Sequence, residues 1–128
     1  MKNYILDTHV LLWAMFDSEK LSQSAQKIIT DISISKYISI SSIWEIAIKN
    51  RIGKLPLSIG IDGVFSRVDA LGCGLIGIDQ QHLKIYTTLP LLHRDPFDGI
   101  IIATALFEEM TIVTSDENIQ KYDVPWAW

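Results

Sequence analysis

The stretch HRDPFDGIIIATA, residues 93–105, places two carboxylates three residues apart in front of an apolar run. Asp95 could cap a helix, with Pro96 at its first position and Asp98 completing an approximate capping box. One or both carboxylates could instead hold a metal ion. The two interpretations are compatible, because the partial positive charge of a helix N-terminus keeps a carboxylate ionised. We therefore expect Asp98 to bind a metal and Asp95 to cap the helix or support the metal ligands.

The elements that must position these acids are short apolar strands alternating with helices. Strands are expected over residues 2–6, 37–40, 75–78 and 111–115. Helices are expected over 9–16, from Ser22 or Ser24, from Ser41 or Ser42 to Gly53, and over 61–71, 80–89 and 97–109, with one further turn at 117–121. This alternation predicts an α/β fold with a parallel sheet covered on both faces. A length of 128 residues suits one domain, residues 1–128.

Three more acids come from distant parts of the chain to one edge of this expected sheet. Asp7 follows the first strand, Glu45 lies one turn into the helix after the second, and Asp116 follows the fourth. Ligands of open parallel sheets bind beyond the carboxyl ends of the strands. Carboxylates placed this close repel one another, and a divalent cation such as Mg²⁺ removes that cost. Two such ions can activate a water and stabilise the leaving oxygen in phosphodiester cleavage.

Each of these acids also has a structural interpretation. Asp7 could cap the first helix, and Asp116 could begin the turn that S-D-E-N suggests. Glu45 could pair with Lys49 one turn later, which contributes only about 0.2–0.5 kcal/mol on an exposed helix face. Glu45 lies among apolar neighbours, however, and an acid in that position is more often functional than merely solvated.

The composition limits the classes of function. The only cysteine is Cys73, so a disulfide framework and a cysteine-based zinc site are excluded. We expect a cytoplasmic protein, because the chain has neither a signal-peptide pattern nor an apolar run of about 18 residues. A net charge of −4 disfavours a general polyanion binder. Lys49, Arg51 and Lys54 nevertheless cluster, and Arg94 adjoins Asp95; these cations are either solvated surface or contacts to phosphate.

Four segments resemble the PIN-domain ribonucleases, in particular the VapC-type toxins of bacterial toxin–antitoxin pairs. They are LDTHVLLW (6–13), SSIWEIAIKNRIGKLPL (41–57), HRDPFDGIIIATAL (93–106) and TIVTSDENIQKYDVPWAW (111–128). They occur in the order and at the intervals of that family and span nearly the whole chain. The resemblance implies a three-layer α/β/α sandwich with a central parallel sheet. It also implies cleavage of RNA phosphodiester bonds, a homodimer, and a small antitoxin protein as the inhibiting partner.

The resemblance further implies which residues form the site. The family's metal-binding and catalytic acids fall on Asp7, Glu45, Asp98 and Asp116, with Mg²⁺ or Mn²⁺ as the cofactor. Asp95 matches a further acid of the HRDPFD subgroup, and Thr8 and Ser115 match hydroxyls near the metal or its waters. Lys49, Arg51 and Arg94 are the candidate contacts to substrate. Trp13 and Trp44 are expected to line the antitoxin groove or the dimer contact.

One departure from the family pattern is visible. Many members with HRDPFD carry Arg after the second Asp, whereas Gly99 stands here. This removes one cation close to the site and weakens the case for a phosphate contact there, although the acids are intact.

Three other functions were weighed against this one. A receiver domain of a signalling pair also gathers acids around Mg²⁺, but it needs paired acids after the first strand and a Lys after the last. An aspartyl-phosphate phosphohydrolase needs a second Asp at the position of His9. An inert copy that only binds antitoxin would not need all four acids.

The placement of His9, His82 and His93 suggests no Ser-His or Cys-His pair, and His93 either shapes a local turn or touches substrate. The sequence does not specify the RNA target.

Overall fold

Five short parallel strands form the centre of the molecule, which we describe from a computed structural model covering residues 2–128. They are β1 (Asn3–Leu6), β2 (Ser35–Ser39), β3 (Cys73–Ile76), β4 (Met110–Val113) and β5 (Trp126–Ala127). The sheet order is β3-β2-β1-β4-β5, and each neighbouring pair is parallel. Ile5, Ile38 and Ile112 are fully buried. Strands covered on both faces need such side chains, so the apolar runs of the sequence are explained.

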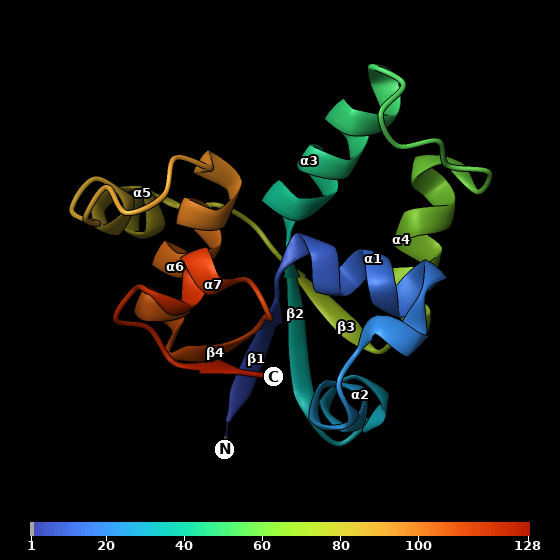
Figure 1. Ribbon diagram of the computed structural model, residues 1–128, viewed down its shortest axis with the longest axis horizontal. Coiled ribbons are helices and arrows are strands. Elements are labelled where there is room, and N and C mark those ends of the chain that lie inside the picture. The colour runs from blue at the N-terminus through green and yellow to red at the C-terminus, as the bar shows by residue number, and fades with distance from the viewer. Residues whose placement is uncertain (1) are drawn as a thin grey trace.

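Helices cover both faces of the sheet (Figure 1). One face carries α1 (Thr8–Phe16), α2 (Gln23–Thr30), α3 (Ile40–Arg51) and α4 (Gly60–Ala70), with a 3₁₀ turn at Ser18–Lys20; the other carries α5 (Gln80–Tyr86), α6 (Pro96–Glu108) and α7 (Glu117–Gln120). A separate apolar core lies on each face, one built from α1 to α4 and the other from α6 and α7. The expected three-layer α/β/α sandwich with a central parallel sheet is therefore confirmed.

Polar side chains cap most of the helices, and Asp7, Ser22 and Asp95 were expected in that role. Asp7, Ser22, Asp79, Asp95 and Asp116 accept backbone N–H groups at the starts of α1, α2, α5, α6 and α7. Such caps satisfy donors that have no partner inside the helix. Most helix bounds accordingly lie within one to three residues of the expected ones.

Several strand and helix boundaries differ from the sequence prediction by one to three residues, and one strand was not expected. β2 ends at Ser39 and α3 begins at Ile40, because the hydroxyl of Ser39, rather than of Ser41 or Ser42, caps the helix through the Ser41 N–H at 3.1 Å. β3 begins at Cys73 instead of residue 75, since its pairing with β2 starts at the Lys36–Cys73 register. The two-residue strand β5 was not expected. Only its backbone bonds to β4 define it, and two residues are too short for a periodic pattern.

Across residues 2–128, the helices are all too short or too polar to cross a lipid bilayer.

The cap of α2 gives a direct test of the local physics, because the sequence left Ser22 and Ser24 as alternatives. The Ser22 hydroxyl accepts the Ala25 N–H at 3.0 Å, whereas Ser24 lies exposed inside the helix. We expect Ser22→Ala to lower the free energy of unfolding by about 1 kcal/mol. The matched variant Ser24→Ala should change it by less than about 0.5 kcal/mol. Urea unfolding measures both, and equal losses would contradict the assignment.

Candidate active site

Asp7 lies at the carboxyl end of β1 and begins α1. One carboxylate oxygen, Oδ1, accepts the Val10 N–H at 2.8 Å, and the other accepts a hydrogen bond from the hydroxyl of Thr114. The side chain is almost completely buried. Burial raises the pKa of Asp7 above its ordinary value, while the bonds from Thr114 and Val10 oppose that rise. Asp7 is thus both the cap of α1 and a buried acid at the edge of the sheet.

Asp98 lies at the third position of α6 and is the centre of the site. It is buried, and its Oδ2 lies 3.0 Å from Nε2 of His93. Asp95 caps the same helix by accepting the Phe97 and Asp98 N–H groups at 2.9 and 3.3 Å. Within residues 2–128, donor atoms of His93, Asp95 and Asp98 lie within 4.8 Å of one another, close enough to share a metal ion. Asp95 therefore caps the helix, as expected, and also points into the site.

Asp116 reaches the site from the carboxyl end of β4. Its Oδ1 accepts the Asn118 N–H at 2.8 Å at the start of α7, and its own N–H donates to the Thr114 hydroxyl at 3.0 Å. Thr114 thus connects Asp7 and Asp116. The hydroxyl that contacts these acids belongs to Thr114, one residue before Ser115, which was the residue selected from the sequence. No signal in the sequence distinguishes the two, because both follow β4, which ends at Val113, and only the contacts with Asp7 and Asp116 separate them.

Burial and the neighbouring acids together raise the pKa of Asp98 to about 7. Burial is the largest cause, followed by the negative charges of Asp95, Asp116 and Asp7, and the bond to His93 opposes the rise. The charge of Asp116 also contributes to the raised pKa of Asp7. The expected gathering of acids at one edge of the sheet is therefore present for these four residues, and it carries the electrostatic cost that a divalent cation would relieve.

Glu45 is part of a separate contact on α3. It is 5% exposed, and its Oε2 pairs with Nζ of Lys49 at 2.8 Å. The ion pair considered at the sequence level is therefore present, but on a buried carboxylate rather than on an exposed helix face. The neighbouring Trp44 contacts Phe97 of α6, with ring centroids 5.4 Å apart. The helix that carries Glu45 thus contacts the helix that carries Asp98.

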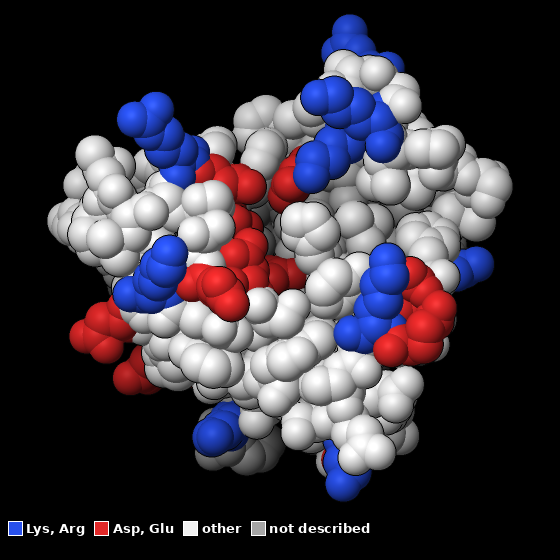
Figure 2. All heavy atoms as spheres, in the orientation of Figure 1, with Lys and Arg blue, Asp and Glu red and all other residues white. Residues whose placement is uncertain are grey.

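The remaining residues selected from the sequence lie around this group. Thr8 donates to the Ser42 hydroxyl at 2.9 Å and so ties α1 to α3. Figure 2 shows the acidic side chains in a hollow in the middle of one face, with basic side chains at its rim. Lys49 and Arg51 occupy the last turn of α3, and Arg51 and Arg94 are exposed. Cations at the rim can contact a polyanion without neutralising the acids at the centre.

The two tryptophans of the first helices differ in environment. Trp13 packs against the core and contacts Trp128 at a ring-centroid distance of 5.8 Å. Trp44 is 60% exposed beside the acids. Of the two, Trp44 is the one that offers an open surface to a partner.

The donor set suits a hard divalent cation. Carboxylate oxygens are the ligands that Mg²⁺ and Mn²⁺ prefer, and the raised pKa of Asp98 shows that the grouped charges lack compensation. His93 adds a nitrogen donor to the group. The sequence had suggested either a turn role or a substrate contact for this residue. The residues present therefore fit a metal ion.

The family model for the PIN domain matches residues 4–125. The chain belongs to the PIN domain family. A search of curated proteins finds no match. The family resemblance read from the four sequence segments is thereby confirmed, and the receiver-domain alternative is left without support.

Solved structures of similar fold come from complexes. A chain of VapBC2 from Rickettsia felis, bound to a promoter DNA fragment, aligns with a TM-score of 0.71 and 17% identity over 97% of this chain and 96% of that one. A chain of DNA-bound VapBC from Salmonella typhimurium aligns with a TM-score of 0.70 and 14% identity over 99% of this chain and 98% of that one. A chain of FitAcB from Neisseria gonorrhoeae aligns with a TM-score of 0.65 and 18% identity over 96% of this chain and 95% of that one. At these identities the likeness shows the fold.

The charge group predicts how the stability of the metal-free protein depends on pH. The folded state keeps the Asp98 proton up to about pH 7, whereas the unfolded chain loses it near the ordinary value of 3.8. Between these values the unfolded state binds fewer protons, so the free energy of unfolding should fall as the pH rises. Asp98→Asn should flatten this fall and raise the stability at pH 8.

Urea titrations in EDTA at several pH values measure the effect. The exposed Asp123 provides the control variant Asp123→Asn, which should keep the wild-type profile. A wild-type profile in Asp98→Asn as well would show that Asp98 is not the titrating group.

Proposed function

We propose that this protein is a metal-dependent endoribonuclease and acts in the cytoplasm as the toxin of a toxin–antitoxin pair. The observation that carries the proposal is the group of Asp7, Asp95, Asp98 and Asp116 at the carboxyl edge of a PIN-domain sheet, with Asp7 and Asp98 buried. Family membership supports nuclease activity, and no other nucleophile–base pair was suggested by the placement of the histidines.

The chain's own residues would divide the work between holding a metal and holding RNA. Asp7, Asp98 and Asp116 would hold one or two Mg²⁺ or Mn²⁺ ions, with Glu45 as the fourth acid once Lys49 turns away. Such an ion, when bound, makes a water more acidic and stabilises charge on a phosphodiester in an in-line displacement. Asp95, Thr8 and the hydroxyls of residues 114 and 115 would orient the ligands.

The rim cations would position the substrate. Lys49, Arg51 and Arg94 lie where the phosphates of a single strand could contact them. Contacts of this kind set affinity and register rather than sequence preference.

The proposed partners follow from the solved complexes of similar fold. Toxin–antitoxin and VapBC assemblies are described for those proteins, and we propose an antitoxin for this chain as well. Trp44 is exposed beside the acids and would line the surface that the antitoxin covers. A homodimer is proposed on the family resemblance.

Neutral variants of the central acids test the catalytic assignment. Asp7→Asn and Asp98→Asn should each lower Mg²⁺-dependent cleavage of total RNA by at least about 100-fold, because the loss of a metal ligand exceeds the effect of a supporting residue. Calorimetric titration with Mn²⁺ should show weaker binding in both variants. Asp123→Asn should behave as wild type. Cleavage at the wild-type rate in either acid variant would refute the assignment.

Neutralising the rim tests the substrate contacts. For Lys49→Gln with Arg51→Gln, the slope of log affinity for RNA against log salt concentration should decrease by about 1.4, at roughly 0.7 per lost contact to single-stranded RNA. The control double variant Lys20→Gln and Lys27→Gln changes cations of the 3₁₀ turn and α2, away from the acids. An equal slope in the wild type and the rim variant would assign these cations to solvated surface.

A further inference from the structure

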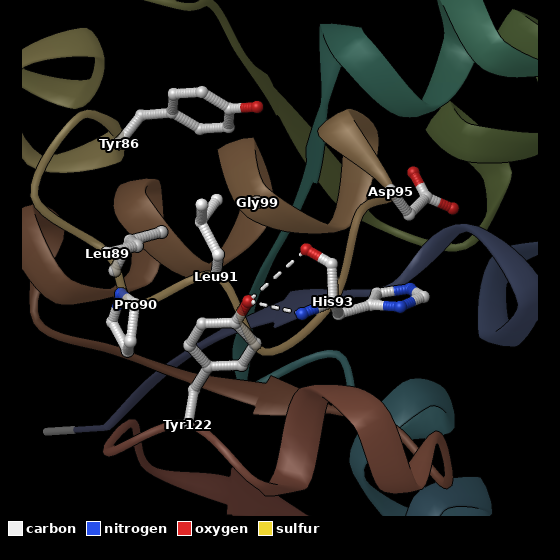
Figure 3. Close-up of a pocket in the computed structure, with 8 residues that line it drawn as sticks. All are labelled: Tyr86, Leu89, Pro90, Leu91, His93, Asp95, Gly99 and Tyr122. Carbon is white, nitrogen blue, oxygen red and sulfur yellow. Dashed lines mark hydrogen bonds between the residues drawn. The ribbon is translucent and has the colours of Figure 1, made fainter.

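A small cavity adjoins the acidic centre on the side of α5. It has a volume of about 60 Å³, and the rings of Tyr86 and Tyr122 lie on either side of it (Figure 3). Leu89 and Gly99 also line the wall, and His93 and Asp95 line it next to the metal-binding group. A molecule held at the acids can therefore extend into this cavity without leaving the protein surface.

The absence of a side chain at Gly99 shapes the cavity. A Cβ atom at this position would lie 2.5 Å from Cε1 of Tyr86, closer than such atoms approach, and 3.1 Å from Cδ1 of the same ring. Gly99 has an ordinary helical backbone, so its lack of a side chain matters here through the room that it leaves for the ring. The position of the Tyr86 ring thus depends on the glycine at position 99, the residue that departs from the family pattern.

The opposite wall is fixed to the acidic centre. The hydroxyl oxygen of Tyr122 accepts the backbone N–H of His93 at 3.1 Å, and the His93 ring contacts Asp98. Tyr122 is buried, whereas Tyr86 is 36% exposed. The cavity therefore has one rigid aromatic wall and one that can adjust to an occupant.

We propose that this cavity receives the nucleoside next to the scissile phosphate, and that the Tyr86–Gly99 pair makes it select a pyrimidine. The inference rests on the proposed ribonuclease function. Aromatic rings bind bases by stacking, which accounts for a tyrosine-walled cavity beside a phosphodiester site. A volume of about 60 Å³ equals roughly four to six water-sized spheres, which encloses part of one ring but not a fused purine.

Mononucleotide titrations test occupancy without requiring cleavage. CMP, UMP, AMP and GMP are each added to protein carrying ¹³C-labelled tyrosine, with Ca²⁺ present, and the ring signals are followed by NMR. CMP and UMP should shift the Tyr86 ring signals and bind at least about fivefold more tightly than AMP and GMP. Equal binding of the four, or shifts that leave Tyr86 unchanged, would overturn the proposal.

Two pairs of variants test the selectivity. Tyr86→Leu should weaken pyrimidine binding by roughly 5- to 150-fold, the range expected for loss of one stacked base. Leu83→Ala changes another exposed residue of α5 and should leave binding as in the wild type. Gly99→Ala should displace the Tyr86 ring and abolish the pyrimidine preference. Gly77→Ala is the matched glycine control, because a Cβ there meets no atom within 4 Å.

The measurements separate this inference from the proposed function. Thermal unfolding and Mn²⁺ affinity of Gly99→Ala should stay close to wild type, since only an exposed ring has to move. Cleavage-site mapping on total RNA should then show altered nucleotides beside the cut. An unchanged cleavage pattern, or a loss only of antitoxin binding, would overturn the inference while leaving the nuclease intact. A wild-type protein that binds pyrimidine nucleotides but cuts no RNA would refute the proposed function and leave the cavity as a nucleotide-binding site only.

Discussion

The structure depends on holding several carboxylates together where little water reaches them. Asp98 illustrates the cost, since burial and its acidic neighbours raise its pKa to about 7. Three of the acids are also helix caps: Asp7, Asp95 and Asp116 each direct one oxygen to backbone N–H groups at the start of a helix. The partial positive charge of those helix ends offsets part of the repulsion. The same carboxylates can therefore cap helices and bind a metal. The negative charge that the helix ends do not offset suits a divalent cation.

The contact between Tyr86 and Gly99 shows how a departure from a family pattern is compensated. An arginine at position 99 would place a cation near the acids, and this chain instead leaves room for an aromatic ring. The substitution thus exchanges a possible phosphate contact for an aromatic wall. Positive charge remains around the hollow (Figure 2), and Arg51 and Arg94 are exposed. The acids stay the same while the side chains around them differ.

Much of the fold could be predicted because its signals are local. The apolar runs of β1 and β4 and the caps at Asp79 and Asp95 are readable from a few neighbouring residues. β5 could not be predicted, because a two-residue strand is defined only by its bonds to β4. The choice of Thr114 over Ser115 as the hydroxyl beside Asp7 had a similar cause, since only the contacts with Asp7 and Asp116 separate the two. The family resemblance supplied residue types and positions but not these contacts.

The sequence by itself determined the fold class, the helix caps and the candidate acids, because periodicity, capping chemistry and strand ends are properties of short segments. Only the tertiary structure decided that Asp7, Asp95, Asp98 and Asp116 share one electrostatic environment, while the buried Glu45 is paired with Lys49. It also decided that His93 joins the group and that a cavity adjoins it. These features depend on distances between residues far apart in the chain, and such distances are set by how the helices pack on the sheet.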